Sequence, residues 1–375
     1  MDIDRRTALT GAAAALTALA SSRASLAAPR RTSRAAPIVI DGLGGFADPY
    51  GPEDASRFTP RGAAELRSSG VTAIHCTVNE VGNAPGTWDK TVANIAQLDQ
   101  GVADNPDLLL RATTAADIRA AKASNRVAIV YGVQDTSLVG TELDRLTQLK
   151  GLGVRIVQLT YNLRNLSGDG ALEPANAGLS KLGRATIERI EHEKLLLDLS
   201  HGGQRTIAEA IAAAARPPII SHTGCRALND NPRNVGDAEL RACAAKGGVI
   251  GIYWMPFLVA SSRPTGADLV AHMGHVRNLC GEDHVAIGTD DIIGKTVIDD
   301  KARAAQRNFF EDRAARGIAA PGEGADIFNI VAQWDDPQRF HHLADALASA
   351  RWTSAQIDKA LGANLLRVYG EVWGG

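Results

Sequence analysis

Short apolar runs alternate with helical patterns along almost the whole chain, and this alternation limits the folds open to it. The apolar runs lie at residues 38–41, 72–77, 127–133, 154–160, 195–200, 218–221, 249–253 and 285–289. The helical patterns lie at residues 60–69, 88–98, 114–123, 142–149, 180–192, 206–214, 237–245 and 266–280. Short apolar runs bounded by turn residues are typical of buried strands, and strands that alternate with helices form parallel sheets. Eight such units predict a closed (β/α)8 TIM barrel rather than an open sheet.

The first residues predict a segment outside this domain. Arg5 and Arg6 precede an apolar stretch at residues 11–20 and a small-residue site at 25–27, which is typical of a twin-arginine-like export signal. The alternative is an amphipathic helix of the mature protein. We expect residues 1–27 to be the signal, 28–37 a linker and 38–375 one barrel domain, whose C-terminal helix spans 354–368. An exported protein of this kind is periplasmic or secreted in a bacterium.

Composition excludes several classes of partner. The 375 residues include 22% charged residues, and the net charge is −2, so nothing suggests nucleic acid as a ligand. Beyond the first segment no apolar run is long enough for a stable membrane span. The four cysteines form no C-x-x-C pair, and we expect buried thiols.

Two histidines each close one of the apolar runs. His201 ends the run at 194–201, His222 ends the run at 217–222, and an alanine-rich helical stretch separates them. Consecutive parallel strands place their ends on one rim, so both imidazoles should lie together. Two neutral imidazoles are what a zinc-type ion needs from its protein. The alternative is a pair of core histidines that are hydrogen-bonded within the barrel.

Other polar residues follow the remaining strands and should share this rim. They are His75, Gln134, Tyr161, the pair Tyr253-Trp254, and Asp290. In metal-assisted hydrolysis an acid such as Asp290 accepts a proton from water, although a turn residue in a Gly-Thr-Asp-Asp loop is the alternative. Long linkers at 162–178, 223–236 and 291–324 all follow strands, so we expect them on the same face.

Several stretches carry a resemblance to a known family. They are Gly153-Val-Arg-Ile-Val-Gln-Leu-Thr-Tyr-Asn162, Gly178-Leu-Ser-Lys-Leu-Gly-Arg184, Leu197-Asp-Leu-Ser-His201, Ile220-Ser-His222, Pro232-Arg-Asn234, Gly247-Gly-Val-Ile-Gly251, Asp283-His-Val-Ala-Ile-Gly-Thr-Asp290 and Leu361-Gly-Ala-Asn-Leu-Leu-Arg367. In their order and spacing, residues 154–368 resemble the membrane dipeptidase (renal dipeptidase) family, peptidase family M19 of the amidohydrolase superfamily. The resemblance implies a metal-dependent hydrolase on a TIM barrel, and a homodimer.

The resemblance also implies roles for individual residues. His201 and His222 match the later metal ligands of the family, and Asp290 matches the acid that handles the hydrolytic water. Arg233, followed by Asn234, matches the arginine that binds the substrate carboxylate. A planar guanidinium suits this role because it can hold both carboxylate oxygens.

Other positions depart from the family pattern. Leu43 and Gly45 stand where the family has a His-x-Asp metal pair, and Gln134 stands where it has a bridging glutamate. Tyr161 replaces a substrate-contacting histidine, and His75 matches no family role. We therefore expect one divalent ion, zinc, with Gln134 as a weak third ligand and the second metal site lost.

These observations leave three functions open. The first is a dipeptidase-like hydrolase of a small carboxylate-bearing amide or dipeptide, in which Tyr161 hydrogen-bonds the developing oxyanion. The second is a metal-free lyase or isomerase that acts on a small carboxylated or aromatic molecule. Its acid–base residues would be His75, His201, His222, Tyr161 and Asp290, and Tyr253 and Trp254 would stack on the molecule. The third is a non-catalytic binding protein, which the cluster of ionisable groups argues against.

Overall fold

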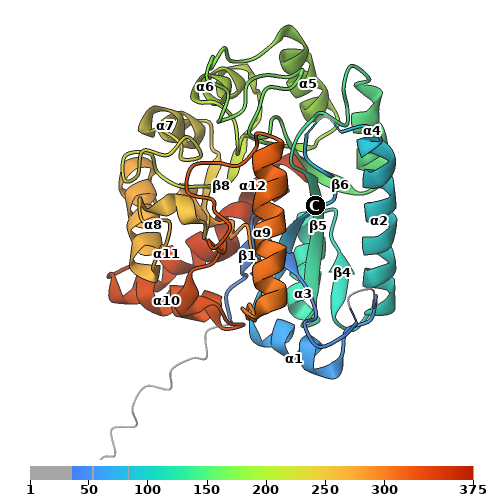
Figure 1. Cartoon of the computed structure of the whole chain (residues 1–375), viewed down its shortest axis with the longest axis vertical. Helices are drawn as coiled ribbons and strands as arrows, with labels where there is room; N and C mark the ends of the chain where they lie inside the picture. Colours follow the sequence, from blue (N-terminus) through green and yellow to red (C-terminus); the bar gives the residue numbers. More distant parts are fainter. Residues whose placement is uncertain (1–35, 53–54, 83, 375) are drawn as a thin grey trace, which may run out of the picture. The chain divides into compact units, whose positions relative to one another are not determined.

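Eight parallel strands form the wall of a barrel in the computed structural model, which describes residues 36–52, 55–82 and 84–374 (Figure 1). In order around the wall they are β1 (Ile40–Asp41), β3 (Ala73–Thr77), β5 (Val127–Val133), β6 (Val154–Gln158), β7 (Leu196–Asp198), β8 (Ile219–Thr223), β9 (Val249–Ile252) and β10 (Val285–Ile287). All eight correspond to the apolar runs of the sequence. The predicted TIM barrel is therefore confirmed.

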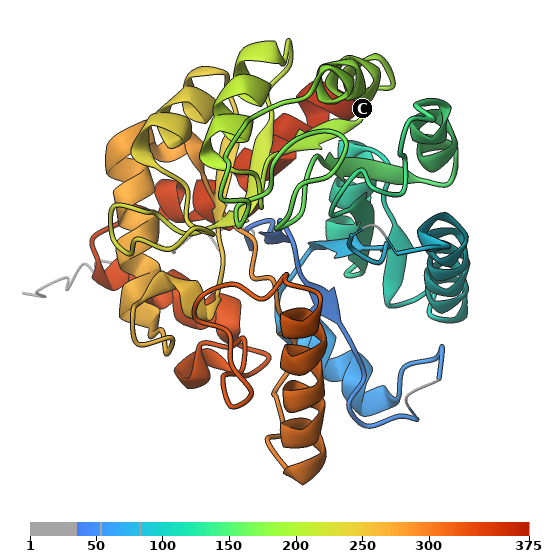
Figure 2. The same ribbon diagram turned by 45° about the horizontal axis from the view of Figure 1, so that its top comes forward.

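Helices follow the strands and surround the wall (Figure 2). They are α1 (Pro60–Ser68), α2 (Thr87–Asp104), α3 (Ala115–Ala123), α4 (Asp144–Gly151), α5 (Lys181–His192), α6 (Gln204–Ala213), α7 (Asp237–Ala245) and α8 (Gly266–Cys280), and later in the chain α9 (Asp300–Ala315), α10 (Arg339–Ser349), α11 (Ser354–Asp358) and α12 (Asn364–Trp373). Side-chain caps start several of them. Thr114 and Thr265, for example, each form a capping box with an aspartate three residues on.

The barrel closes between its first and last strands through one carboxylate. The Gly42 N–H donates to the Ile287 carbonyl at 2.8 Å. Asp41 accepts from the Thr289 N–H at 2.8 Å and from the Thr289 hydroxyl at 2.6 Å. Burial raises the pKa of Asp41 to about 7, and the two bonds from Thr289 act against that shift.

The N-terminal end of the barrel is apolar and covered by α12. Ile40, Ala73 and Ile156 point inward there and pack with Leu365 and Tyr369 in one buried cluster. The sequence predicted a C-terminal helix over 354–368, and the structure divides it into α11, a π-helical turn over Lys359–Ala363 and α12. A Cβ on Gly362 would lie 2.5 Å from the Ile38 carbonyl oxygen, so only glycine allows this approach to β1.

The segment after β10 differs from the expected loop. It contains β11 (Ile292–Ile293), which pairs with β2 (Gly45–Phe46), and the 16-residue helix α9. Within this fully described helix Arg313 alone is buried, so no apolar stripe could reveal it in the sequence. The short strand β4 (Leu109–Arg111), which pairs with β5, was also missed. Three residues are too few for a periodic signal.

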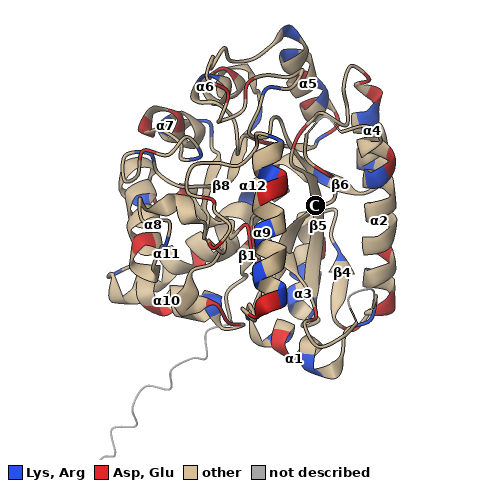
Figure 3. Ribbon diagram, in the orientation of Figure 1, with Lys and Arg blue, Asp and Glu red and all other residues tan. Residues whose placement is uncertain are grey.

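The predicted export signal, linker and homodimer stay predictions. Residues 1–27 of the export signal and most of the 28–37 linker lie outside the described residues. Pro37–Gly375 form one compact unit by their contacts. Within the described chain, no helix is both long and apolar enough to cross a membrane. Figure 3 shows basic and acidic residues interspersed along the helices, in line with the small net charge.

The closing carboxylate gives a first prediction. Asp41→Ala should lower the free energy of unfolding by about 3 kcal/mol, because the buried Thr289 N–H would lose its acceptor. Asp41→Asn should lower the free energy of unfolding by less, since its amide oxygen still accepts from that N–H. Urea unfolding followed by circular dichroism measures both variants. A wild-type midpoint for Asp41→Ala would contradict the role of this carboxylate in closing the barrel.

Candidate metal centre and catalytic site

The barrel interior changes from apolar to polar toward the carboxyl ends of the strands. Side chains two residues apart on a strand share a face. The apolar layer of Ala73, Ile156, Leu196 and Ile219 is therefore followed by an inward-facing layer of His75, Gln158, Asp198 and Ser221. All four polar residues are buried. A parallel barrel positions its chemistry at this end.

His201 and His222 meet just above this layer. His222 lies on β8, and His201 follows β7 with a φ of 61°; their ring centroids are 4.8 Å apart. The Nε2 atom of each ring is buried and has no hydrogen-bond partner among the described residues. Asp290, with a φ of 56°, follows β10 and completes the group. The ligand atoms of these three residues all lie within 4.8 Å of one another.

Hydrogen bonds on the opposite side of each ring fix which nitrogen is free. His201 Nδ1 lies 2.6 Å from Asn162 Oδ1, while the Asn162 amide nitrogen donates to the Ile318 carbonyl. The Asn162 oxygen therefore accepts from an Nδ1–H on His201. His222 Nδ1 lies 2.8 Å from Ser221 Oγ, which itself donates to Asp198 at 2.5 Å. Both rings thus carry their proton on Nδ1 and present an Nε2 lone pair, the form that binds metals.

Electrostatics keep these imidazoles neutral. Burial first, and then the positive charge of Arg233, lower the pKa of both His201 and His222 well below the ordinary value of 6.5. Neutral imidazoles and a nearby carboxylate are a donor set that fits a zinc-type divalent ion. The residues present therefore fit one ion.

A second ion finds no comparable ligands in the described part of the chain. Leu43 and Gly45, the positions that the resemblance assigned to a first metal pair, have no ligand atom in their side chains. The Gln134 amide nitrogen donates to Thr77 Oγ1 at 2.8 Å. Gln134 borders a cavity that Asp290 also borders. The role of Gln134 as a third ligand stays a prediction. The third member of the group formed with His201 and His222 is Asp290.

His75 lies deeper in the barrel than the group formed by His201, His222 and Asp290. Its Nδ1 lies 2.6 Å from the Gly42 carbonyl, and its buried Nε2 has no partner in the described chain. A Cβ on Gly132 would lie 1.9 Å from this Nε2, so the ring occupies the space that the glycine leaves free. Burial lowers the pKa of His75. Its catalytic role stays a prediction.

Arg233 brings an unpaired positive charge to the site. Its side chain is buried, and one terminal nitrogen has no partner in the described part of the chain. The guanidinium carbon lies 5.8 Å from the centroid of the Tyr253 ring. The carboxyl group of Asp290 is buried although the residue as a whole is partly exposed, and this burial raises its pKa to about 7 against the pull of Arg233 and Arg313. A buried, unpaired guanidinium is costly and is prepared to receive an anion.

Tyr253 and Asn234, which were considered as substrate-binding residues, form hydrogen bonds within the protein. The Tyr253 hydroxyl donates to Asn234 Oδ1. The Asn234 amide nitrogen donates to the carbonyls of Asn229 and Phe257 at 2.8 and 2.9 Å. These contacts hold the 229–234 loop that carries Arg233, which makes Tyr253 and Asn234 positioning residues for Arg233 in this structure.

Tyr161 and Arg313 form a hydrogen-bonded pair, and of the two only Tyr161 was predicted from the sequence. The Tyr161 ring stacks on His201 with centroids 4.1 Å apart, and Arg313 Nη1 donates to the Tyr161 hydroxyl at 3.0 Å. Glu323 holds the guanidinium through two bonds of 2.6 and 2.8 Å. Arg313 was missed because α9 has no apolar stripe. Asp198 and Ser221 did carry a signal, as polar residues at inward positions of otherwise apolar strands.

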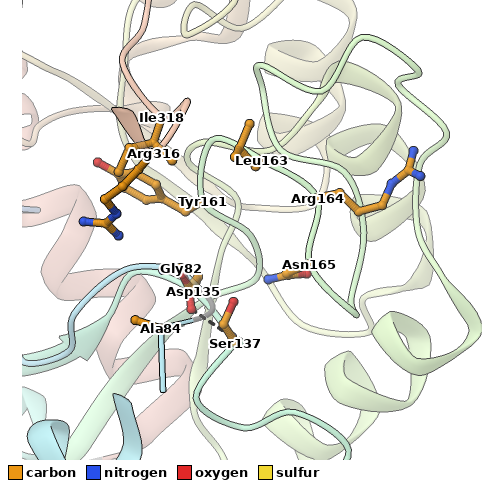
Figure 4. Close-up of a pocket in the computed structure, with 10 residues that line it drawn as sticks. All are labelled: Gly82, Ala84, Asp135, Ser137, Tyr161, Leu163, Arg164, Asn165, Arg316 and Ile318. Atoms are coloured by element: carbon orange, nitrogen blue, oxygen red, sulfur yellow. Dashed lines mark hydrogen bonds between the residues drawn. The ribbon is translucent and has the colours of Figure 1, made fainter. Parts of the chain in front are cut away.

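A cavity of about 300 Å³ adjoins Tyr161. Figure 4 shows Tyr161 and Ile318 on one wall and Asp135, Ser137 and Gly82 on the other. Asp135 accepts from the N–H groups of Gly82 and Ser137, and its burial raises its pKa to about 6.

Comparisons with known proteins identify the family and the fold of this chain. The family model for membrane dipeptidase (peptidase family M19) matches residues 59–301. Dipeptidase verJ of Clonostachys rogersoniana is 30% identical over 49% of this chain, and the match spans only 48% of that relative. An amidohydrolase structure from Pseudomonas aeruginosa is 30% identical with a TM-score of 0.76, covering 91% of this chain and 98% of the other.

A further solved structure shares the fold at lower identity. The dipeptidase AC, described as a metallo peptidase of family M19, is 17% identical with a TM-score of 0.73, covering 91% of this chain and 100% of its own. The family match covers more than half of the chain, over the region that supplies His75, His201, His222 and Asp290. The chain therefore belongs to the membrane dipeptidase family, peptidase family M19.

Proposed function

We propose that this protein is a metal-dependent hydrolase that cleaves an amide bond in a small molecule with a free carboxylate, using one zinc ion. The observation that carries the proposal is the convergence of His201 Nε2, His222 Nε2 and the Asp290 carboxylate. Family membership and the relatives named dipeptidases support hydrolysis over elimination or isomerisation. A divalent ion bound there would polarise the scissile carbonyl and lower the pKa of water.

The side chains around this centre have separate tasks. Arg233 binds the substrate carboxylate, since its guanidinium is buried and one of its nitrogens is unpaired. Asp290 takes a proton from the attacking water and returns it to the leaving nitrogen. Its carboxylate lies with the two imidazoles in one group, which places it to accept a proton from water and to release it again.

Tyr161 donates its hydroxyl hydrogen to the oxygen that becomes negative. Arg313 donates to the Tyr161 oxygen, so that oxygen already accepts a hydrogen bond and its own hydrogen is free to point elsewhere. The neighbouring positive charge also makes the hydroxyl a stronger donor. Stacking on His201 keeps the Tyr161 ring beside the metal-binding group.

Metal content tests the centre directly. The purified protein should hold about one ion per chain, and the double variant His201→Ala with His222→Ala should hold none. His275→Ala serves as the control, because His275 is paired with Asp237 away from this group and its loss should not change the metal content. Elemental analysis after dialysis measures all three. Full metal content in the double variant would refute the assignment.

Asp290→Asn tests the proton transfer. The amide cannot accept a proton, so kcat should fall by roughly 100-fold or more. Metal content, measured on the same sample, separates a lost base from a lost ligand. The control is Asp312→Asn, which changes an exposed carboxylate of α9 and should turn over normally. Wild-type turnover in Asp290→Asn would remove this residue from the mechanism.

Tyr161→Phe tests oxyanion binding. The phenyl ring keeps the stacking on His201 but lacks the hydroxyl, so kcat should fall by roughly 100-fold while KM changes little. Steady-state kinetics at several substrate concentrations separate the two constants. A rise in KM with unchanged kcat would instead assign Tyr161 to ground-state binding.

A further inference from the structure

Asp290 also borders a cavity, together with Leu43 and Gly45 after the first strand. The cavity has a volume of about 350 Å³, with Asp290 and Gln134 on its polar side and Leu43, Cys76 and Leu98 on its apolar side. Gly45 also borders it, and a Cβ there would meet nothing closer than an Ile292 side-chain carbon at 3.4 Å. Space is therefore open beside the catalytic carboxylate.

This cavity adjoins a larger one. The second has a volume of about 860 Å³ and shares Phe46, Thr77 and Leu98 with the first. The rings of Phe46 and Phe58 stack with centroids 6.0 Å apart, and Leu109 borders the same space. Together the two cavities are of the size and apolar character typical of small-molecule sites.

Few charged groups lie at these walls, and Asp291 and Asp48 already have partners within the protein. Of the described residues that border the two cavities, none is basic and the acids besides Asp290 are Asp291 and Asp48. Asp291 binds Arg339 at 2.8 Å. The two oxygens of Asp48 accept the N–H groups of Tyr50 and Thr59. An ammonium group placed beyond Asp290, among Leu98, Phe46 and Phe58, would lose its water and meet mainly apolar side chains, which is unfavourable.

We infer that the substrate is an N-acyl amino acid with an uncharged, apolar acyl group rather than a dipeptide with a free amino terminus. This inference rests on the proposed function. The carboxylate lies at Arg233, the amide at Asp290, and the acyl chain extends past Leu98 toward Phe58. Water adds to the carbonyl carbon and the C–N bond breaks. The products are a carboxylic acid and a free amino acid, whose nitrogen gains the proton taken from water.

The experiment compares three substrates with the same C-terminal residue: N-octanoylalanine, N-acetylalanine and alanylalanine, each with either enantiomer of that residue. Release of alanine gives kcat/KM, with the rate for alanylalanine halved because each cleavage yields two alanines. Because each buried methylene adds favourable transfer free energy, the octanoyl compound should exceed the acetyl compound by roughly 10-fold or more. Alanylalanine should be the poorest substrate. Calorimetric titration of Asp290→Asn with the same compounds should give the same order of affinity.

Variants locate the acyl chain. Leu98→Trp narrows the passage between the cavities, so it should lower the octanoyl-to-acetyl ratio by roughly 10-fold, and Leu98→Ala provides a second variant if the first does not fold. Leu163→Trp is the matched control, because Leu163 borders the cavity beside Tyr161 instead. A ratio that responds to Leu163→Trp and not to Leu98→Trp would overturn the placement.

The two proposals fail in different ways. If alanylalanine is cleaved faster than both acylated compounds, the inference about the acyl group is wrong while the hydrolase remains. If the protein holds its metal ion and cleaves none of these compounds, the proposed function fails as well.

Discussion

Closure of the barrel by the Asp41 carboxylate is the constraint on which the rest of the site depends. Asp41 holds both the N–H and the hydroxyl of Thr289, and the next residue, Asp290, donates its N–H to the Leu43 carbonyl. Asp290 is therefore fixed in a left-handed conformation at the seam, facing the two histidines. Non-glycine residues in this conformation cost free energy, and such strain is commonly kept at functional sites.

The centre combines groups that are costly to bury with neighbours that define their state. Asn162 and the Ser221–Asp198 pair orient the imidazoles. Burial first, and then the charge of Arg233, keeps the imidazoles unprotonated. Buried nitrogens without partners lower stability unless a ligand satisfies them. Their concentration at one rim, together with the unpaired guanidinium, distinguishes this region from an ordinary barrel core.

The segment after β10 forms hydrogen bonds with two adjacent residues of the centre, Tyr161 and Asn162. Arg313 of α9 donates to the Tyr161 hydroxyl, and the Ile318 carbonyl accepts from Asn162, which in turn orients His201. Helix α9, whose buried residue is Arg313, thus contributes to the site through hydrogen bonds rather than through apolar packing. Leu43 and Gly45, after the first strand, border a cavity that Asp290 also borders.

The sequence by itself determined the barrel, because strand and helix periodicity and the turn residues between them are local properties. It also located His201, His222 and Asp290, since each closes an apolar run and parallel strands end at one rim. It could not reveal Arg313 or the pairing of Tyr253 with Asn234. Only the tertiary structure decided these: Arg313 meets a tyrosine 152 positions away, and Asp41 meets Thr289 across 248 positions. Such contacts depend on where closure of the barrel brings distant segments, which no local pattern encodes.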